Sequence, residues 1–204
     1  MSPITHFFAS WLVASATTKN PRDRALITAA GVLPDLDGLG IVVDIGQSVI
    51  SGQENTYHYY QWYHHELLHG WPGAAAICIA LTCFARERWR VFFLCLFTFH
   101  LHLLCDLIGS RGPTPDDMWP IYYNAPLFRN PIWIWKYQWR LDGWQNRVIT
   151  EILLVLSFWQ ATRKGYSFLE MFNRRADRVL VEVLQKWRRQ LFGRANLLPK
   201  QRVE

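Results

Sequence analysis

The chain alternates long apolar runs with short polar breaks, a pattern typical of packed helices. Apolar residues recur at helical spacing over about 3–18, where Ser2 supplies a cap and proline stands in the first turn. A second helix is expected from about residue 22. It must end by Leu33, because Pro34 disfavours helix in the residue before it. Two helices joined by a short break therefore open the chain.

The middle of the chain predicts a helical hairpin. Two apolar runs, 73–85 and 91–104, are separated by a charged segment that favours a turn around Arg88. His69 and Asp106 lie at nearly equal numbers of residues from that turn. In an antiparallel helix pair such positions share one height, so we expect both to lie at the open end of the hairpin.

The rest of the chain also lacks strand patterns. A proline-rich loop is expected over 109–131, and apolar periodicity predicts helices over 146–162 and 168–192. The predicted fold class is all-α: a helical bundle with a buried metal site, plus a C-terminal basic amphipathic helix. We place the bundle domain at 1–162 and the tail at 163–204.

Composition is that of a folded chain with an unevenly charged end. The chain has 204 residues, of which 50% are hydrophobic, which is ample for a core and excludes a disordered protein. Its net charge is +6, and 163–204 alone carries eleven Lys or Arg against four Asp or Glu. The basic balance therefore belongs to the tail and not to the predicted domain.

The cysteines and the N-terminal run bear on the compartment. All four cysteines, Cys78, Cys83, Cys95 and Cys105, lie in apolar runs without the paired spacing of a metal finger, so we expect buried reduced thiols. The N-terminal run ends in a segment, 14–16, that resembles a signal-peptidase site. No Lys or Arg precedes it, so we expect a helix that stays in the protein.

Hydropathy leaves membrane insertion open. The run 91–109 is long enough to span, whereas 71–85 is shorter than the ~20 residues that a span normally needs. Ionisable groups in such a run are costly unless they face a protein interior, so they favour a functional site in either solvent. If the hairpin inserts, the arginines around Arg88 place its turn in the cytoplasm.

Two features suit a membrane surface, and each has an alternative. The helix predicted over 168–192 combines an apolar stripe with six Lys or Arg, which suits an anionic lipid surface. It could instead pack on the domain, and nucleic-acid binding is the least favoured because no base-reading motif accompanies the charge. Aromatic residues crowd 119–144, where they suit either core packing or a belt at the lipid headgroups.

Histidines and carboxylates are grouped as metal ligands would be. Five of the seven histidines fall in two segments, 63–69 and 100–106, and Asp35 and Asp37 share one turn. Imidazole and carboxylate together suit zinc, manganese or iron, and six or more such groups could hold two ions. One histidine on an apolar helix is usually a hydrogen-bonded core residue, but five at one level favour a metal site.

These elements resemble the membrane-bound metal-dependent hydrolases of the LexA-regulated bacterial inner-membrane type. The shared pattern covers about the first 120 residues. It consists of an early His, Leu-Pro-Asp-x-Asp, a His-rich segment, His-x-x-x-Asp, and a glycine-bearing loop before Trp-Pro. In this chain the corresponding positions are His6, Leu33 to Asp37, His64 to His69, His102 with Asp106, and Gly112 before Trp119-Pro120.

The resemblance implies one or two divalent ions, with zinc first and manganese or iron as alternatives. The expected ligands are His6, Asp35, His64, His69, His102 and Asp106. Asp37, His65 and Glu66 are then supporting or acid/base residues. The chain departs from the pattern at two places: His65 stands where the family has Arg, and Leu68-His69-Gly70 replaces Thr-His-Ser.

The family is similar to zinc-dependent phospholipases C, and that analogy implies hydrolysis of a lipid or other membrane-associated phosphoester at the bacterial inner membrane. A bound metal would lower the pKa of water from about 16 toward 7, which makes a metal-bound hydroxide the expected nucleophile. Two alternatives are a non-catalytic membrane protein with a structural metal and a basic interaction module that acts through the tail.

Overall fold

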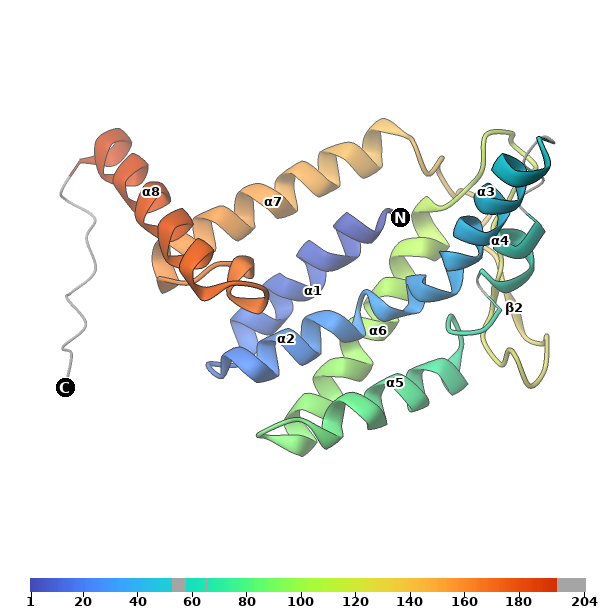
Figure 1. The fold of residues 1–204 in the computed structure, drawn as a ribbon, viewed down its shortest axis with the longest axis horizontal. Helices are drawn as coiled ribbons and strands as arrows, with labels where there is room; N and C mark the ends of the chain where they lie inside the picture. The colour runs from blue at the N-terminus through green and yellow to red at the C-terminus, as the bar shows by residue number, and fades with distance from the viewer. Residues whose placement is uncertain (53–57, 65, 194–204) are drawn as a thin grey trace. The chain divides into compact units, whose positions relative to one another are not determined.

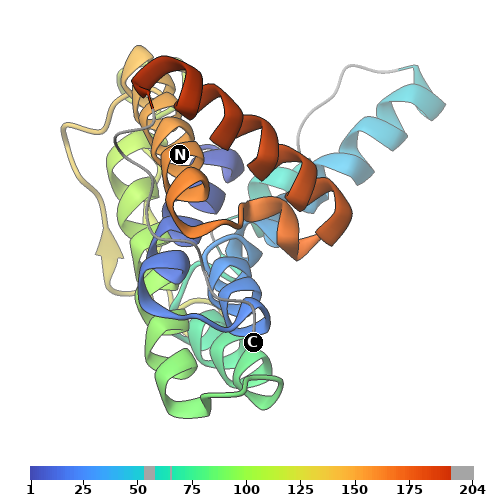
Figure 2. The same ribbon diagram turned by 90° about the vertical axis from the view of Figure 1, so that its left-hand side faces the viewer.

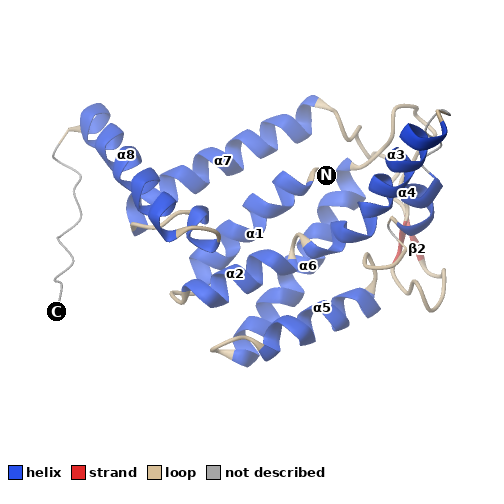
Figure 3. Ribbon diagram, viewed as in Figure 1, coloured by secondary structure: helices blue, strands red, loops and turns tan. Residues whose placement is uncertain are grey.

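The structure, a computed structural model, describes residues 1–52, 58–64 and 66–193 and is mainly helical (Figure 3). This confirms the all-α class. In chain order the elements are α1 Pro3–Thr17, α2 Pro21–Ala30, the 3₁₀ helix η1 Leu33–Leu39, α3 Gly40–Ser51, α4 His58–Tyr63, α5 Trp71–Cys83, α6 Arg88–Gly109, β1 Ile121–Tyr122, β2 Ile132–Trp133, α7 Trp144–Lys164, the 3₁₀ helix η2 Phe168–Met171 and α8 Arg174–Phe192.

The chain divides into two compact units, Met1–Thr150 and Glu151–Glu204. In the first unit α6 packs against α1, α2 and α5, and Figures 1 and 2 show α1, α2 and α6 side by side. The core between them includes the fully buried side chains of Ile27, Val91 and Phe99. Burying one such side chain stabilises the fold by about 1.5–3 kcal/mol, so this core holds the helices in fixed register.

The first two helices begin where the sequence predicts, because both have side-chain caps. The Ser2 hydroxyl accepts from the Thr5 N–H at 3.3 Å, and the Asn20 side chain accepts from the first turn of α2. α2 ends at Gly31, whose lack of a side chain lets α1 approach: a Cβ there would lie 1.8 Å from Ser10 Oγ. No larger residue fits between these helices without displacing one of them.

Several elements differ from the sequence prediction. Residues 35–38, expected as a turn, belong to η1, and α6 already begins at Arg88 inside the predicted hairpin turn. The expected loop contains β1, which pairs antiparallel with β2 just after the loop; both strands have two residues and are too short to show alternation. The last predicted helix is broken before Asn173, because its side chain caps α8.

The cysteine prediction is correct for the thiols and wrong for the burial of one of them. All four cysteines are free thiols, and Cys78 and Cys95 are buried. Cys83, however, is exposed. It is the last residue of α5, where the helix leaves the core for the turn.

α6 is the one described helix that is long and apolar enough by itself to cross a membrane; α2 with the η1–α3 segment would qualify only as a span bent by 48°. This result rests on length and composition. One face of α6 carries Phe99 and Leu103 in the core, whereas Phe93 and Phe97 are more than half exposed. An apolar outward face is what lipid contact requires.

The second unit is built from the end of α7, η2 and α8. Val181 and Leu184 of α8 pack against Ala161, and this small core is closed by Phe158 and Leu180. The buried Asp177 carboxylate accepts from both the N–H and the hydroxyl of Ser167 at 2.7 Å. That contact ties the start of α8 to the segment before η2.

Replacing Asp23 tests the hairpin turn. Its fully buried carboxylate accepts from the N–H groups of Arg86 and Glu87, at 2.9 and 3.2 Å. Asp23→Ala leaves both donors without this partner, so we expect a loss of about 1–3 kcal/mol in the free energy of unfolding. Urea unfolding followed by circular dichroism measures it. The control Asp116→Ala, at an exposed loop position, should stay near wild type; equal stability of both variants would contradict the role of Asp23.

Candidate metal centre

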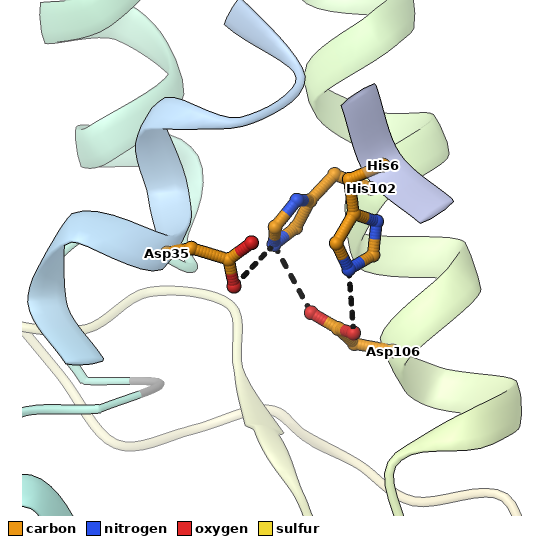
Figure 4. Close-up of side chains that lie close together, drawn as sticks. All are labelled: His6, Asp35, His102 and Asp106. Carbon is orange, nitrogen blue, oxygen red and sulfur yellow. Dashed lines mark hydrogen bonds and ion pairs between the residues drawn. The ribbon is translucent and has the colours of Figure 1, made fainter. Parts of the chain in front are cut away.

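Among the residues that the structure describes, side chains that could ligate a metal form two adjacent groups in the first unit. His6, Asp35, His102 and Asp106 make the first, and Asp37, His64 and His69 make the second. Within each group the candidate ligand atoms lie within 4.8 Å of one another. Figure 4 shows the first group, in which side chains from α1, η1 and α6 point toward a common point.

The first group is centred on the buried Asp106 carboxylate. His6 Nε2 lies 3.1 Å from its Oδ1, and His102 Nε2 lies 3.0 Å from its Oδ2. Asp35 stands further away, with 3.8 Å between its Oδ1 and His102 Nε2. Ser110 donates its hydroxyl to Asp106 Oδ1 at 3.0 Å, and the Met1 ammonium group also contacts that oxygen. Asp106 therefore gathers partners from the N-terminal segment and from α6 and its C-cap.

Three polar atoms of this group have no hydrogen-bond partner in the described part of the chain. They are Asp35 Oδ2, Asp106 Oδ2 and His6 Nδ1, and all three are buried. A buried polar atom left without a partner costs about 1–3 kcal/mol, so such atoms indicate a missing ligand or ion. The donor set therefore fits a divalent cation, which Asp35 Oδ2 could ligate.

The second group is centred on Asp37. One carboxylate oxygen lies 2.9 Å from His64 Nδ1, and the other lies 2.8 Å from His69 Nδ1 and accepts from the Leu68 N–H at 3.1 Å. With three donors on its two oxygens, Asp37 sets the orientation of both rings. A carboxylate that holds Nδ1 in this way directs Nε2 toward a metal.

The two groups meet at a pair of ring nitrogens. His69 Nε2 lies 3.0 Å from His102 Nε2 and 3.5 Å from Asp106 Oδ2. His102 Nδ1 donates to the carbonyl oxygen of Gly31 at 3.0 Å, so the lone pair of this ring, when neutral, is on Nε2. Two imidazole nitrogens at this distance must share either a proton or a cation.

The nearby carboxylates of Asp37 and Asp106 favour a positive charge on the His69 ring. Burial alone would lower the pKa of His69, but hydrogen bonds to Asp106 and Asp37 and the charges of both carboxylates outweigh it and raise the pKa to about 9. In the metal-free protein His69 therefore carries a proton at neutral pH. A metal ion that binds here must displace that proton.

Two cavities adjoin the site. The smaller, of about 270 Å³, is lined by Asp35, Asp106 and His64 among others. The larger, of about 680 Å³, shares with it His64, Tyr60, Ser110, Trp119 and Leu141. The candidate metal ligands are thus reached from a cavity of the size that small-molecule sites have.

Comparison with known proteins identifies the family. The family model described as YdjM inner membrane protein matches residues 1–172, which include every residue of both groups. The chain belongs to the YdjM inner membrane protein family. No curated protein and no solved structure matched the chain. Family membership confirms the predicted location at the inner membrane.

Glu66 and His100 of this YdjM-family chain belong to neither group. Glu66 lines the larger cavity and forms an ion pair with Arg129 at 3.0 Å. His65 lies outside the described residues. His100 points elsewhere, with hydrogen bonds to the Leu96 carbonyl oxygen and the Tyr123 hydroxyl.

Sequence reasoning missed three contributors to the site. The carbonyl oxygen of Gly31 leaves no sequence signal, because any residue has one. Ser110 stands four residues after Asp106, so helical spacing could have placed it beside that carboxylate. Trp119, noted as part of a Trp-Pro pair and of the aromatic residues over 119–144, packs edge-on against the His64 ring at 5.4 Å between centroids.

Replacing Asp37 tests its role in orienting the two rings. Asp37→Asn keeps the side-chain shape but offers an amide nitrogen in place of one acceptor oxygen, so one ring loses its partner. We expect the affinity for zinc to fall about 10- to 100-fold, as for other residues that position metal-bound histidines. Competition with a chelating dye measures it. Asp177→Asn, a buried carboxylate of the second unit, is the control; unchanged affinity in Asp37→Asn would contradict the assignment.

Proposed function

We propose that this inner membrane protein is a metal-dependent hydrolase, a phosphoesterase that acts on a lipid or other membrane-associated phosphoester. The observation that carries the proposal is the 3.0 Å contact between His69 Nε2 and His102 Nε2, with Asp106 beside both. It forms only where the segment before α5, which carries His69, packs against α6, which carries His102 and Asp106. A cation is the partner that satisfies both nitrogens and the carboxylates around them.

The residues that would hold the ion are His6, Asp35, His69, His102 and Asp106, with His64 at the second group. This mixture of imidazole and carboxylate suits zinc, and also manganese or iron. Two groups joined through His69 provide for one ion or two. When bound, such an ion lowers the pKa of water and polarises a phosphoryl oxygen, which is the chemistry that phosphoester hydrolysis needs.

Residues of the chain itself would orient the metal ligands and transfer protons. Asp37 holds the rings of His64 and His69, as a carboxylate that receives three donors is suited to do. His64 lines both cavities while its Nδ1 stays on Asp37, which leaves its Nε2 for a metal ion. Glu66 at the larger cavity, and His65, are acid/base candidates.

The inner membrane location of the protein and the apolar residues of α3 support a membrane-derived substrate. The protein belongs to an inner membrane family, and α3, which contributes Ile41 to the wall of the larger cavity, exposes Val42, Val49 and Ile50. Apolar side chains beside a cavity mouth suit an acyl chain more than a fully hydrated substrate.

The exposed face of α8 supports contact with the lipid surface. Val179, Val183 and Trp187 form a stripe that its own unit leaves exposed. Four exposed basic residues flank it: Arg175, Arg178, Lys186 and Arg189. Apolar and basic faces in this arrangement suit the interface of an anionic membrane.

Substitution within α6 tests the hydrolase proposal. Purified protein stripped of metal should regain phosphoesterase activity with zinc or manganese. His102→Ala should lose bound metal and lower the rate at least 100-fold, because it removes one of the two converging nitrogens. His100→Ala, on the same helix but bonded to Leu96 and Tyr123, is the matched control. Restored metal without activity, or His102→Ala equal to wild type, would refute the proposal.

A peptide covering residues 173–193 tests the lipid contact of α8. It should become helical with phosphatidylglycerol vesicles and much less so with phosphatidylcholine vesicles, as followed by circular dichroism. Replacing Arg175 and Arg178 by Gln should weaken binding by about 2 kcal/mol, since each basic residue near an anionic surface contributes about 1 kcal/mol. Equal helicity with both kinds of vesicle would speak against an electrostatic contact.

A further inference from the structure

The larger cavity extends from the metal centre to a second set of polar residues. Besides the wall that it shares with the smaller cavity, it is lined by Arg111, Gly112, Asp117, Arg140 and Asp142. Ser110 links the two parts, because it donates to Asp106 and directly precedes Arg111. A ligand that reaches the metal ligands through this cavity therefore passes Arg111.

Arg111 differs from the other arginines near this cavity. Arg140 is neutralised by Asp142, with N–O contacts of 2.9 and 2.7 Å, and Arg129 is paired with Glu66. The side chain of Arg111 has no hydrogen bond or ion pair within the part of the chain that the structure describes, although its Nε atom is buried. A buried guanidinium nitrogen without an acceptor is costly, which indicates that an acceptor binds there.

The backbone holds Arg111 firmly in place. Its N–H donates to the Trp139 carbonyl oxygen at 3.1 Å, and its own carbonyl oxygen accepts from the Leu141 N–H at 2.8 Å. Gly112 then donates to the Asp117 carbonyl oxygen at 2.9 Å. An arginine held by its backbone on both sides loses little further freedom when it binds a ligand.

We infer that Arg111 binds the phosphoryl oxyanion of the substrate in the larger cavity, beside the metal centre. This inference rests on the proposed phosphoester substrate. A planar guanidinium matches phosphate with two parallel hydrogen bonds, and a half-buried position strengthens them.

The carboxylates that line the larger cavity do not neutralise the positive charge of Arg111. Asp142 and Glu66 already have arginine partners, and Asp117 is exposed, where water screens it.

Inorganic phosphate tests the subsite without any turnover. Titration calorimetry on the zinc-loaded full chain in detergent should show phosphate binding. In Arg111→Gln the affinity should fall at least 10-fold while metal content stays the same; Arg111→Lys should keep part of it, since lysine keeps the charge but not the two-pronged geometry. Arg22→Gln, at an exposed position of α2, makes the same charge change and should match wild type.

Turnover then separates the two sources of a phosphoryl group. With phospholipid vesicles and with glycerol 3-phosphate as alternative substrates, Arg111→Gln should raise KM on whichever is hydrolysed. Unchanged phosphate affinity and KM in Arg111→Gln, at full metal content, would overturn the subsite while leaving the hydrolase standing. Arg111-dependent phosphate binding without hydrolysis of either substrate would support the subsite and count against the hydrolase.

Discussion

The structure depends on the approach of two imidazole nitrogens inside the first unit. His69 and His102 face each other at 3.0 Å, and the opposite nitrogen of each ring is held by an acceptor, the Asp37 carboxylate or the Gly31 carbonyl oxygen. Such a pair is unfavourable unless a positive charge lies between its members. The surrounding carboxylates favour that charge, which is why we propose that the site binds a cation.

Helix packing makes this approach possible. Gly31 ends α2 where α1 passes it closely, and the same residue presents its carbonyl oxygen to His102 on α6. Asp23 at the other end of α2 receives the hairpin turn between α5 and α6. α2 therefore positions the hairpin at both of its ends. A change in the packing of α2 would therefore displace the candidate metal ligands on α6.

The first unit combines the apolar surface of a membrane protein with a buried polar site. The chain belongs to an inner membrane family, and helices that carry the polar site on one face expose large apolar side chains on another. Ionisable groups in such helices are tolerated when they face the protein interior and one another. The cavity beside the site has a single unpaired arginine among its described lining residues, which is why we propose that it binds an anionic group.

The sequence by itself determined the first two helices, the hairpin and most of α7, because caps, prolines and helical periodicity act locally. It also marked His69 and Asp106 as neighbours through their nearly equal distances from the turn. Only the tertiary structure decided that Asp37 holds two rings, that His100 faces Tyr123, and that Gly31 and Ser110 join the site. Those contacts depend on helix rotation and on backbone atoms, which are set by packing between distant segments.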